Sequence, residues 1–137
     1  MKKYLVLFIL FLSMSNVSVC QFAGETIWAT GQGTGGYANK HWIGDFNGDG
    51  IDDKLQLVGT GDWWVALSSG TSFNGEVRWA QNQDAGATKY FVGDFNGDGM
   101  DDVLSYRQTG GVWKLSLAQQ DLTTGVYSFA EETAVKH

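Results

Sequence analysis

The chain has no proline, a single cysteine and only two histidines among 137 residues. The cysteine, Cys20, ends an N-terminal segment that we expect to be removed, so we expect no disulfide in the mature domain. Its stability must then come from elsewhere, and a bound metal ion is the obvious substitute. Basic residues are also scarce, with nine Lys and Arg against 15 Asp and Glu. Nucleic acid is therefore not an expected partner, because it would need a basic patch.

Long apolar runs are also missing. The longest covers residues 4–12, which is too short for a membrane-spanning helix of about 20 residues. A positively charged start precedes it and small polar residues follow, as in a secretory signal peptide over residues 1–20. We therefore expect a secreted, extracellular protein. The alternative is a lipid anchor on Cys20, which Val19 disfavours because small residues such as Gly or Ala normally precede such a cysteine.

What remains is rich in apolar residues and glycine. Hydrophobic residues make up 43% of the sequence and aromatic residues 14%, and there are 19 glycines. This composition and length predict at most one globular, β-rich domain over residues 21–137. Without the leader, seven basic residues face 15 acidic ones, and eight of these acids lie in two short segments.

Those two segments are near-identical copies placed 49 residues apart, at 42–53 and 91–102. In each copy, oxygen-bearing side chains stand at loop positions 1, 3, 5 and 9, and position 7 can offer its backbone carbonyl. Such a set suits a hard cation, in particular Ca²⁺. Glycines at positions 4 and 6 allow the tight curl that aims these oxygens at one point. The expected ligands of two calcium sites are Asp45, Asn47, Asp49, the Ile51 carbonyl and Asp53, and Asp94, Asn96, Asp98, the Met100 carbonyl and Asp102.

Other loop families share this Asp-x-Asn-x-Asp-Gly opening. An EF-hand or a dockerin repeat needs an acidic residue at loop position 12, where this chain has Gln56 and Ser105. The residues after each loop alternate or are β-rich, which predicts a strand and not a helix. The local plan is therefore strand, loop, strand. Asp-Gly-rich loops can also be plain polar turns, an alternative that two matched copies make less credible.

The repeat is wider than the loops. Trp28-Ala29, Trp79-Ala80 and Phe129-Ala130 recur at spacings of 51 and 50 residues, which predicts two units of about fifty residues. Trp63, Val65 and Leu67 share one face of a strand, as do Trp113, Leu115 and Leu117, and we expect this face to be core. The expected strands are 40–44, 54–58, 63–68 and 76–80 in the first unit and 89–93, 102–106, 112–117 and 126–130 in the second.

The run Ile-Gly-Asp-Phe-Asn-Gly-Asp-Gly, followed by Asp-Asp and a downstream Trp-x-Val/Leu-x-Leu strand, resembles the FG-GAP (VCBS-type) repeats of integrin-like β-propellers. The resemblance covers Trp28 to Ala130, as repeats at about 28–78 and 79–130. It implies an all-β fold of two four-stranded antiparallel propeller blades, each with one Ca²⁺ between its first and second strands. Asp52 and Asp101 would lie beside these sites. The chain departs from the family in having Asn at the third loop position and only two blades.

Two blades cannot close a propeller, which normally needs four to eight. The exposed strand edges and apolar faces must be covered. We therefore expect either a homo-oligomer, such as three two-blade chains making six blades, or a fragment of a larger propeller.

We expect a binding module and not an enzyme, because no Ser/His/Asp or Cys/His set is apparent. Family analogy points to adhesion or to recognition of a carbohydrate or a cell-surface protein. Trp64, which lies opposite Trp63 where the second unit has Lys114, is a candidate ligand contact; the alternative is that it packs against a neighbouring blade or protomer. Two further alternatives are a purely structural blade pair and a glycoside hydrolase that uses Asp49 and Asp52.

We expect His41 to be a surface residue, and Trp42, Tyr37 and Tyr90 to be core or rim aromatics.

Overall fold

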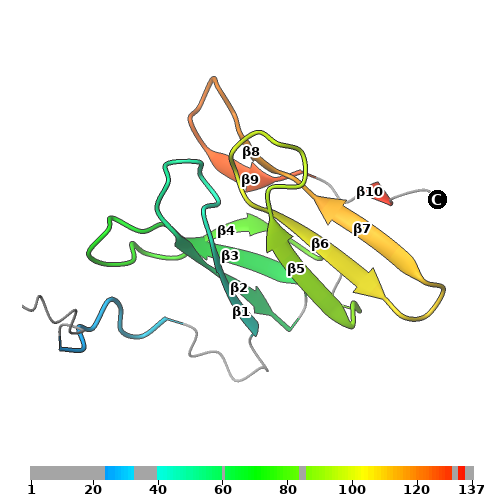
Figure 1. Ribbon diagram of the computed structural model, residues 1–137, viewed down its shortest axis with the longest axis horizontal. Coiled ribbons are helices and arrows are strands. Elements are labelled where there is room, and N and C mark those ends of the chain that lie inside the picture. Colours follow the sequence, from blue (N-terminus) through cyan, green and yellow to red (C-terminus); the bar gives the residue numbers. More distant parts are fainter. Residues whose placement is uncertain (1–23, 33–39, 60, 84–85, 131–132, 135–137) are drawn as a thin grey trace, which may run out of the picture.

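The computed structural model describes residues 24–32, 40–59, 61–83, 86–130 and 133–134 (Figure 1). Across these ranges the protein consists of β-strands and turns, with no helix. Accordingly, the part of the chain that the structure describes contains no helix long and apolar enough to cross a membrane. The expected signal segment 1–20, Cys20 and Tyr37 lie outside the described residues.

The first unit folds as a four-stranded antiparallel sheet in the order β1-β2-β3-β4. The four expected strands are confirmed, with small shifts at their ends. Polar and apolar residues alternate along the second strand, so that Leu55 and Leu57 enter one face while Lys54 points to the other. The bounds are β1 Lys40–Gly44, β2 Asp53–Val58, β3 Asp62–Ala66 and β4 Val77–Ala80.

The second unit repeats the first three strands as β5 (Lys89–Gly93), β6 (Asp102–Arg107) and β7 (Val112–Ser116). All three were expected, and they pair as an antiparallel sheet in the order β7-β6-β5. The two-residue strand β10 (Thr133–Ala134) pairs along the outer edge of β7. The all-β, antiparallel prediction is therefore confirmed.

The last expected strand forms as β9 (Tyr127–Phe129), but its pairing differs from that of β4 in the first unit. It pairs with β8 (Ala118–Gln120) as a separate hairpin and does not pair with β7. Turn chemistry explains this difference. The Asp121 carboxylate accepts hydrogen bonds from the amides of Thr123 and Thr124 at 2.8 and 3.2 Å, and this turns the chain back at once.

The core lies between one face of the first sheet and the second unit. Leu55, Trp63 and Val65 are 0–1% exposed. The Trp63 ring lies 5.5 Å from Tyr90 of β5 and 6.4 Å from Phe129 of β9. Large aromatic side chains thus fill the space between the two sheets. The expectation that Trp42 and Tyr90 are core or rim aromatics is confirmed, since both are partly buried and pack against this cluster.

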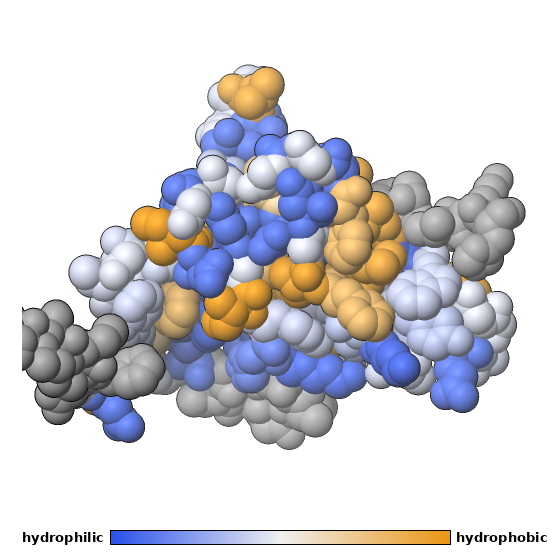
Figure 2. All heavy atoms as spheres, viewed as in Figure 1, coloured by the Kyte–Doolittle hydropathy of each residue, from blue (hydrophilic) through white to orange (hydrophobic). Residues whose placement is uncertain are grey.

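The corresponding face of the second sheet is less covered. Trp113, Leu115 and Leu117 were expected to be core, and each is only partly buried. Leu67 of the first unit is partly buried as well. Figure 2 shows hydrophobic residues at the surface over β5–β7. The second unit therefore presents to solvent a face that the first unit buries.

Candidate metal centre

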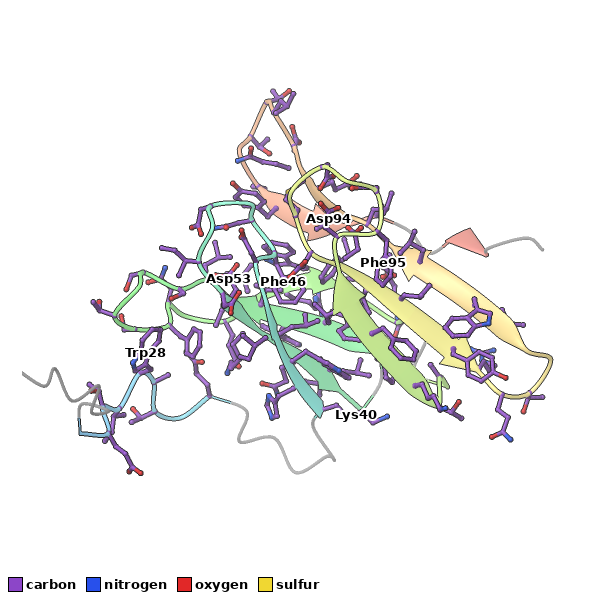
Figure 3. All side chains as sticks on the ribbon, viewed as in Figure 1. Trp28, Lys40, Phe46, Asp53, Asp94 and Phe95 are labelled. Carbon is purple, nitrogen blue, oxygen red and sulfur yellow. The ribbon has the colours of Figure 1, made fainter. Side chains whose placement is uncertain are left out.

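The two duplicated loops join equivalent strands. Residues 45–52 connect β1 to β2, and residues 94–101 connect β5 to β6. Asp45 follows the end of β1 and Asp53 begins β2, so the two strand ends hold both carboxylates at the base of the loop. In Figure 3, Asp53 lies beside Phe46 at the base of the first loop, and Asp94 lies in the second loop.

The first loop curls around the Asp45 carboxylate. This group accepts hydrogen bonds from the amides of Gly48, Asp49 and Gly50 at 2.8, 3.1 and 2.7 Å. Asn47 Oδ1 accepts from the Asp49 amide at 3.0 Å. Gly48 and Gly50 have φ of 76° and 83°, a region that side chains with a Cβ rarely adopt. The loop glycines are therefore required by the backbone path.

The second loop repeats this geometry. The Asp94 carboxylate accepts from the amides of Gly97, Asp98 and Gly99 at 2.6, 3.2 and 2.9 Å. Asn96 Oδ1 accepts from the Asp98 amide at 2.9 Å. In both loops the residue at position 5, Asp49 or Asp98, accepts from the amide two residues later at 2.9 Å. Two copies with such similar distances indicate one shared structural design.

The last acid of each loop is fully buried. Asp53 and Asp102 are both 0% exposed. Asp53 accepts hydrogen bonds from the Phe46 amide in the loop and from the Ser68 amide beyond β3, at 3.2 and 2.7 Å. Asp102 does the same with Phe95 and Ala118, at 3.0 and 2.8 Å. Each buried carboxylate thus connects its loop to the chain segment that leaves the third strand.

Negative charge is concentrated at the buried acids. The pKa of Asp53 is raised to about 6, mainly because burial disfavours the charged carboxylate; the charges of Asp49 and Asp45 add to this rise, and the hydrogen bonds from two backbone amides oppose it. The pKa of Asp102 is also raised, mainly by burial, and the charges of Asp98 and Asp94 add to the rise. Neither the Lys54–Glu76 ion pair at 2.6 Å nor the weaker Arg78–Asp62 pair reaches a loop acid. A cation at the loop would relieve this repulsion.

The oxygen donors fit a hard cation, although the side chains are not arranged as a complete coordination shell. Among the described residues, no three Asp, Glu, His or Cys side chains form a metal-binding group. The loop oxygens instead accept backbone amides, which leaves lone pairs on carboxylates that can each accept about four hydrogen bonds or ligand bonds. Two of the five expected donors in each loop, an Asn amide and a backbone carbonyl, also lie outside that set of residue types. The residues that would hold Ca²⁺ remain the two sets predicted from the sequence.

Asp52 and Asp101 hold equivalent sequence positions but differ in their surroundings. Asp101, from the second loop, accepts a hydrogen bond from the Asp45 amide at 2.9 Å, and its own amide donates to the Asp45 carbonyl at 2.7 Å. Asp52 is exposed. The sequence pattern placed both beside their own loops. It gave no sign that Asp101 bridges to the other loop, because this contact depends on how the two sheets pack.

The remaining candidates lie away from the loops. Trp64 is half-buried on the face of the first sheet opposite Trp63, where it pairs with Gln56. His41 is exposed, as expected. Both interpretations of Trp64, as a ligand contact and as a packing residue, are therefore taken forward as predictions.

Comparison of the chain with protein-family models, with curated proteins and with solved structures finds no match.

Proposed function

We propose that this protein is a secreted calcium-binding module of FG-GAP/VCBS-type repeats, built as two blades of a β-propeller, with one Ca²⁺ in each duplicated loop. The observation that carries the proposal is the matched geometry of the loops around Asp45 and Asp94. Two copies of an acidic, glycine-turned loop at the same place in two equivalent sheets favour a structural ion over an active site. An active site would have no evident reason to be duplicated.

Calcium would offset charge that the fold itself concentrates. The mature domain has a net charge of −8, counted from seven basic and 15 acidic residues. Two Ca²⁺ ions would reduce this to −4. Binding to the folded state alone adds to the free energy of unfolding, by about 2.7 kcal/mol per site at free Ca²⁺ a hundredfold above the dissociation constant. A domain without disulfides would gain substantially from this.

Isothermal titration calorimetry on the chelator-treated protein tests calcium binding directly. The expected result is uptake of two Ca²⁺ ions per chain, with a rise in melting temperature that depends on the Ca²⁺ concentration. No heat of binding at millimolar Ca²⁺ would exclude the proposal.

Removing one expected ligand from each loop separates metal binding from turn formation. Asp49→Ala and Asp98→Ala should each lower the melting temperature in Ca²⁺ and have little effect in chelator. Asp121→Ala is the matched control, because this exposed acid also accepts two backbone amides in a turn but lies outside both loops. Its effect should be the same with and without Ca²⁺. Equal losses in both conditions for the loop variants would mean that the loops act as ordinary turns.

The recognition role rests on the family resemblance and on Trp64. We propose that the module serves in adhesion or in binding a carbohydrate or a protein, and has no catalytic activity. The expected behaviour is binding to saccharides or cell surfaces that chelator abolishes and Ca²⁺ restores. A second candidate, a purely structural blade pair within a larger assembly, is favoured by the uncovered apolar face of the second sheet.

A further inference from the structure

The second unit covers the first through a specific set of contacts. Gly44, at the end of β1, is buried so closely that an added Cβ would lie 2.5 Å from Asp101 Oδ2 and 2.8 Å from Val92 Cγ1. Gly48 of the first loop similarly lies against Met100, with 3.2 Å between an added Cβ and Cγ. Phe46, beneath this loop, is 0% exposed. Three residues of the second unit, Val92, Met100 and Asp101, therefore line this junction.

The same positions in the second unit are open. Gly93 corresponds to Gly44, and an added Cβ there would come no closer than 3.9 Å to another residue, the Phe95 ring. Gly97 corresponds to Gly48, and an added Cβ would meet nothing within 4 Å. Phe95 is 46% exposed, in contrast to its buried counterpart Phe46. Among the described residues, nothing covers the second unit in the way that the second unit covers the first.

An apolar hollow of about 390 Å³ lies at this position. Among its lining residues, Phe91 is 42% exposed and stacks on Trp113, with 5.9 Å between ring centroids. We call the surface formed by Phe91, Phe95, Leu104 and Trp113 the open face. Figure 2 shows hydrophobic residues at the surface in this region, over β5–β7. Clustered, exposed aromatic side chains of this kind are typical of interaction sites.

The first unit also exposes the residues that are equivalent to the ones with which the second unit covers the first. The sequence counterparts of Val92, Met100 and Asp101 are Ile43, Ile51 and Asp52. Ile43 is 55% exposed, Ile51 is 38% exposed, and Asp52 is exposed. We call these three residues the covering surface. Each molecule thus exposes an open face and a covering surface. These two surfaces are equivalent to the ones that meet where its own second unit packs on its first.

We propose that the chain associates head to tail with a second copy of itself, whose covering surface packs on the open face. Asp52 of the incoming copy would accept the Asp94 amide, as Asp101 accepts the Asp45 amide within one chain. The contact continues an internal junction, and its two sides are different surfaces, so it is heterologous and leads to a ring or an extended series of copies. The proposal does not require calcium, so it stands or falls separately from the metal sites.

Sedimentation of the full chain over a range of concentrations is the first test, with and without chelator. The expected result is a mass at least twice that of one chain, in a discrete or an open series of copies. A monomer at high protein concentration under both conditions would overturn the proposal. It would mean that some other occupant, such as a further repeat, covers the open face.

Two variants, each of which blocks one of the two surfaces, test whether the open face pairs with the covering surface. Gly93→Val places a side chain on the open face at a position with room within one chain. Ile43→Lys places a charge in the covering surface. Each variant alone should be monomeric, whereas an equimolar mixture should give a one-to-one heterodimer, because each still carries the half that the other has lost. Leu122→Ser is the matched control, since Leu122 is 91% exposed but lies on the β8–β9 hairpin.

The mixing result also separates head-to-tail contact from a symmetric dimer. If both variants stay associated like the wild type, or both are monomeric and the mixture forms no heterodimer, the proposed junction is wrong. A Leu122→Ser variant that dissociates would equally contradict it. Circular dichroism of each variant verifies that a loss of association does not come from unfolding.

Discussion

The two glycines at the ends of β1 and β5 show how neighbours decide the role of a residue. Gly44 and Gly93 have the same sequence context and the same place in their sheets. Gly44 is buried against Asp101 and Val92, whereas Gly93 is partly exposed. Neither glycine has a positive φ. The need for glycine at position 44 is therefore steric, and it arises from the other unit.

This difference predicts unequal effects of the same substitution. Gly44→Ala should lower the free energy of unfolding by about 1–3 kcal/mol, because the new methyl group overlaps packed neighbours. Gly93→Ala should change it by less than about 0.5 kcal/mol. Urea denaturation of both variants, followed by tryptophan fluorescence, measures this. Equal destabilisation would mean that the two positions are packed alike in solution.

At the scale of elements, the β8–β9 hairpin contributes to the core of the first unit and not to its own sheet. Its residue Phe129 lies 6.0 Å from Phe46 and 5.4 Å from Trp79 between ring centroids, and Tyr127 stacks on Trp79 at 5.6 Å. The hairpin thus joins the two units by packing. We expect it to unfold together with the first sheet.

Truncation of the hairpin's core residue tests this role. Phe129→Ala should cost about 3–5 kcal/mol, the range for removing a buried aromatic side chain. Leu122→Ala, in the same hairpin but 91% exposed, should change stability by less than about 0.5 kcal/mol. Chemical denaturation gives both values. A small effect of Phe129→Ala would mean that the hairpin is not docked on the first sheet.

At the scale of the whole molecule, the two explanations of Trp64 make different predictions. Its counterpart Lys114 pairs with Ser105, which pairs with Tyr90, and directly paired residues share a face of the sheet. This is the face of the second sheet whose Tyr90 packs against Trp63. In a head-to-tail assembly, Trp64 of the next copy would therefore lie at the junction between copies.

Trp64→Ala distinguishes a junction residue from a ligand contact. If Trp64 lies between copies, the variant should associate only at about tenfold or more higher protein concentration, since a buried interface tryptophan is often worth more than 1.4 kcal/mol. Analytical ultracentrifugation over a dilution series measures this shift. Unchanged association together with lost saccharide binding would instead identify Trp64 as the ligand contact.

Much of the fold could be predicted from local patterns. The bounds of β1 and β5 match their expected ranges, because both strands end at a loop whose turn residues are unmistakable. The pairing of β9 could not be predicted, since it depends on a turn set by Asp121 that extends into the β8–β9 hairpin, whereas at the equivalent place in the first unit Ser68 and Phe73 form only an isolated bridge. Each set of expected metal ligands lies within one loop, and its binding of an ion stays a prediction, whereas the bridge from Asp101 to Asp45 is a product of sheet packing. No local spacing could reveal it.

That bridge makes the dependence between the repeats directional. Replacing Asp101 in the second loop removes the carboxylate that accepts the Asp45 amide of the first loop. Replacing Asp52 leaves the second loop unchanged within one chain. If copies associate through Asp52, the second loop of each neighbour would gain the same hydrogen bond that Asp101 gives to the first loop, and the dependence between loops would then run in both directions.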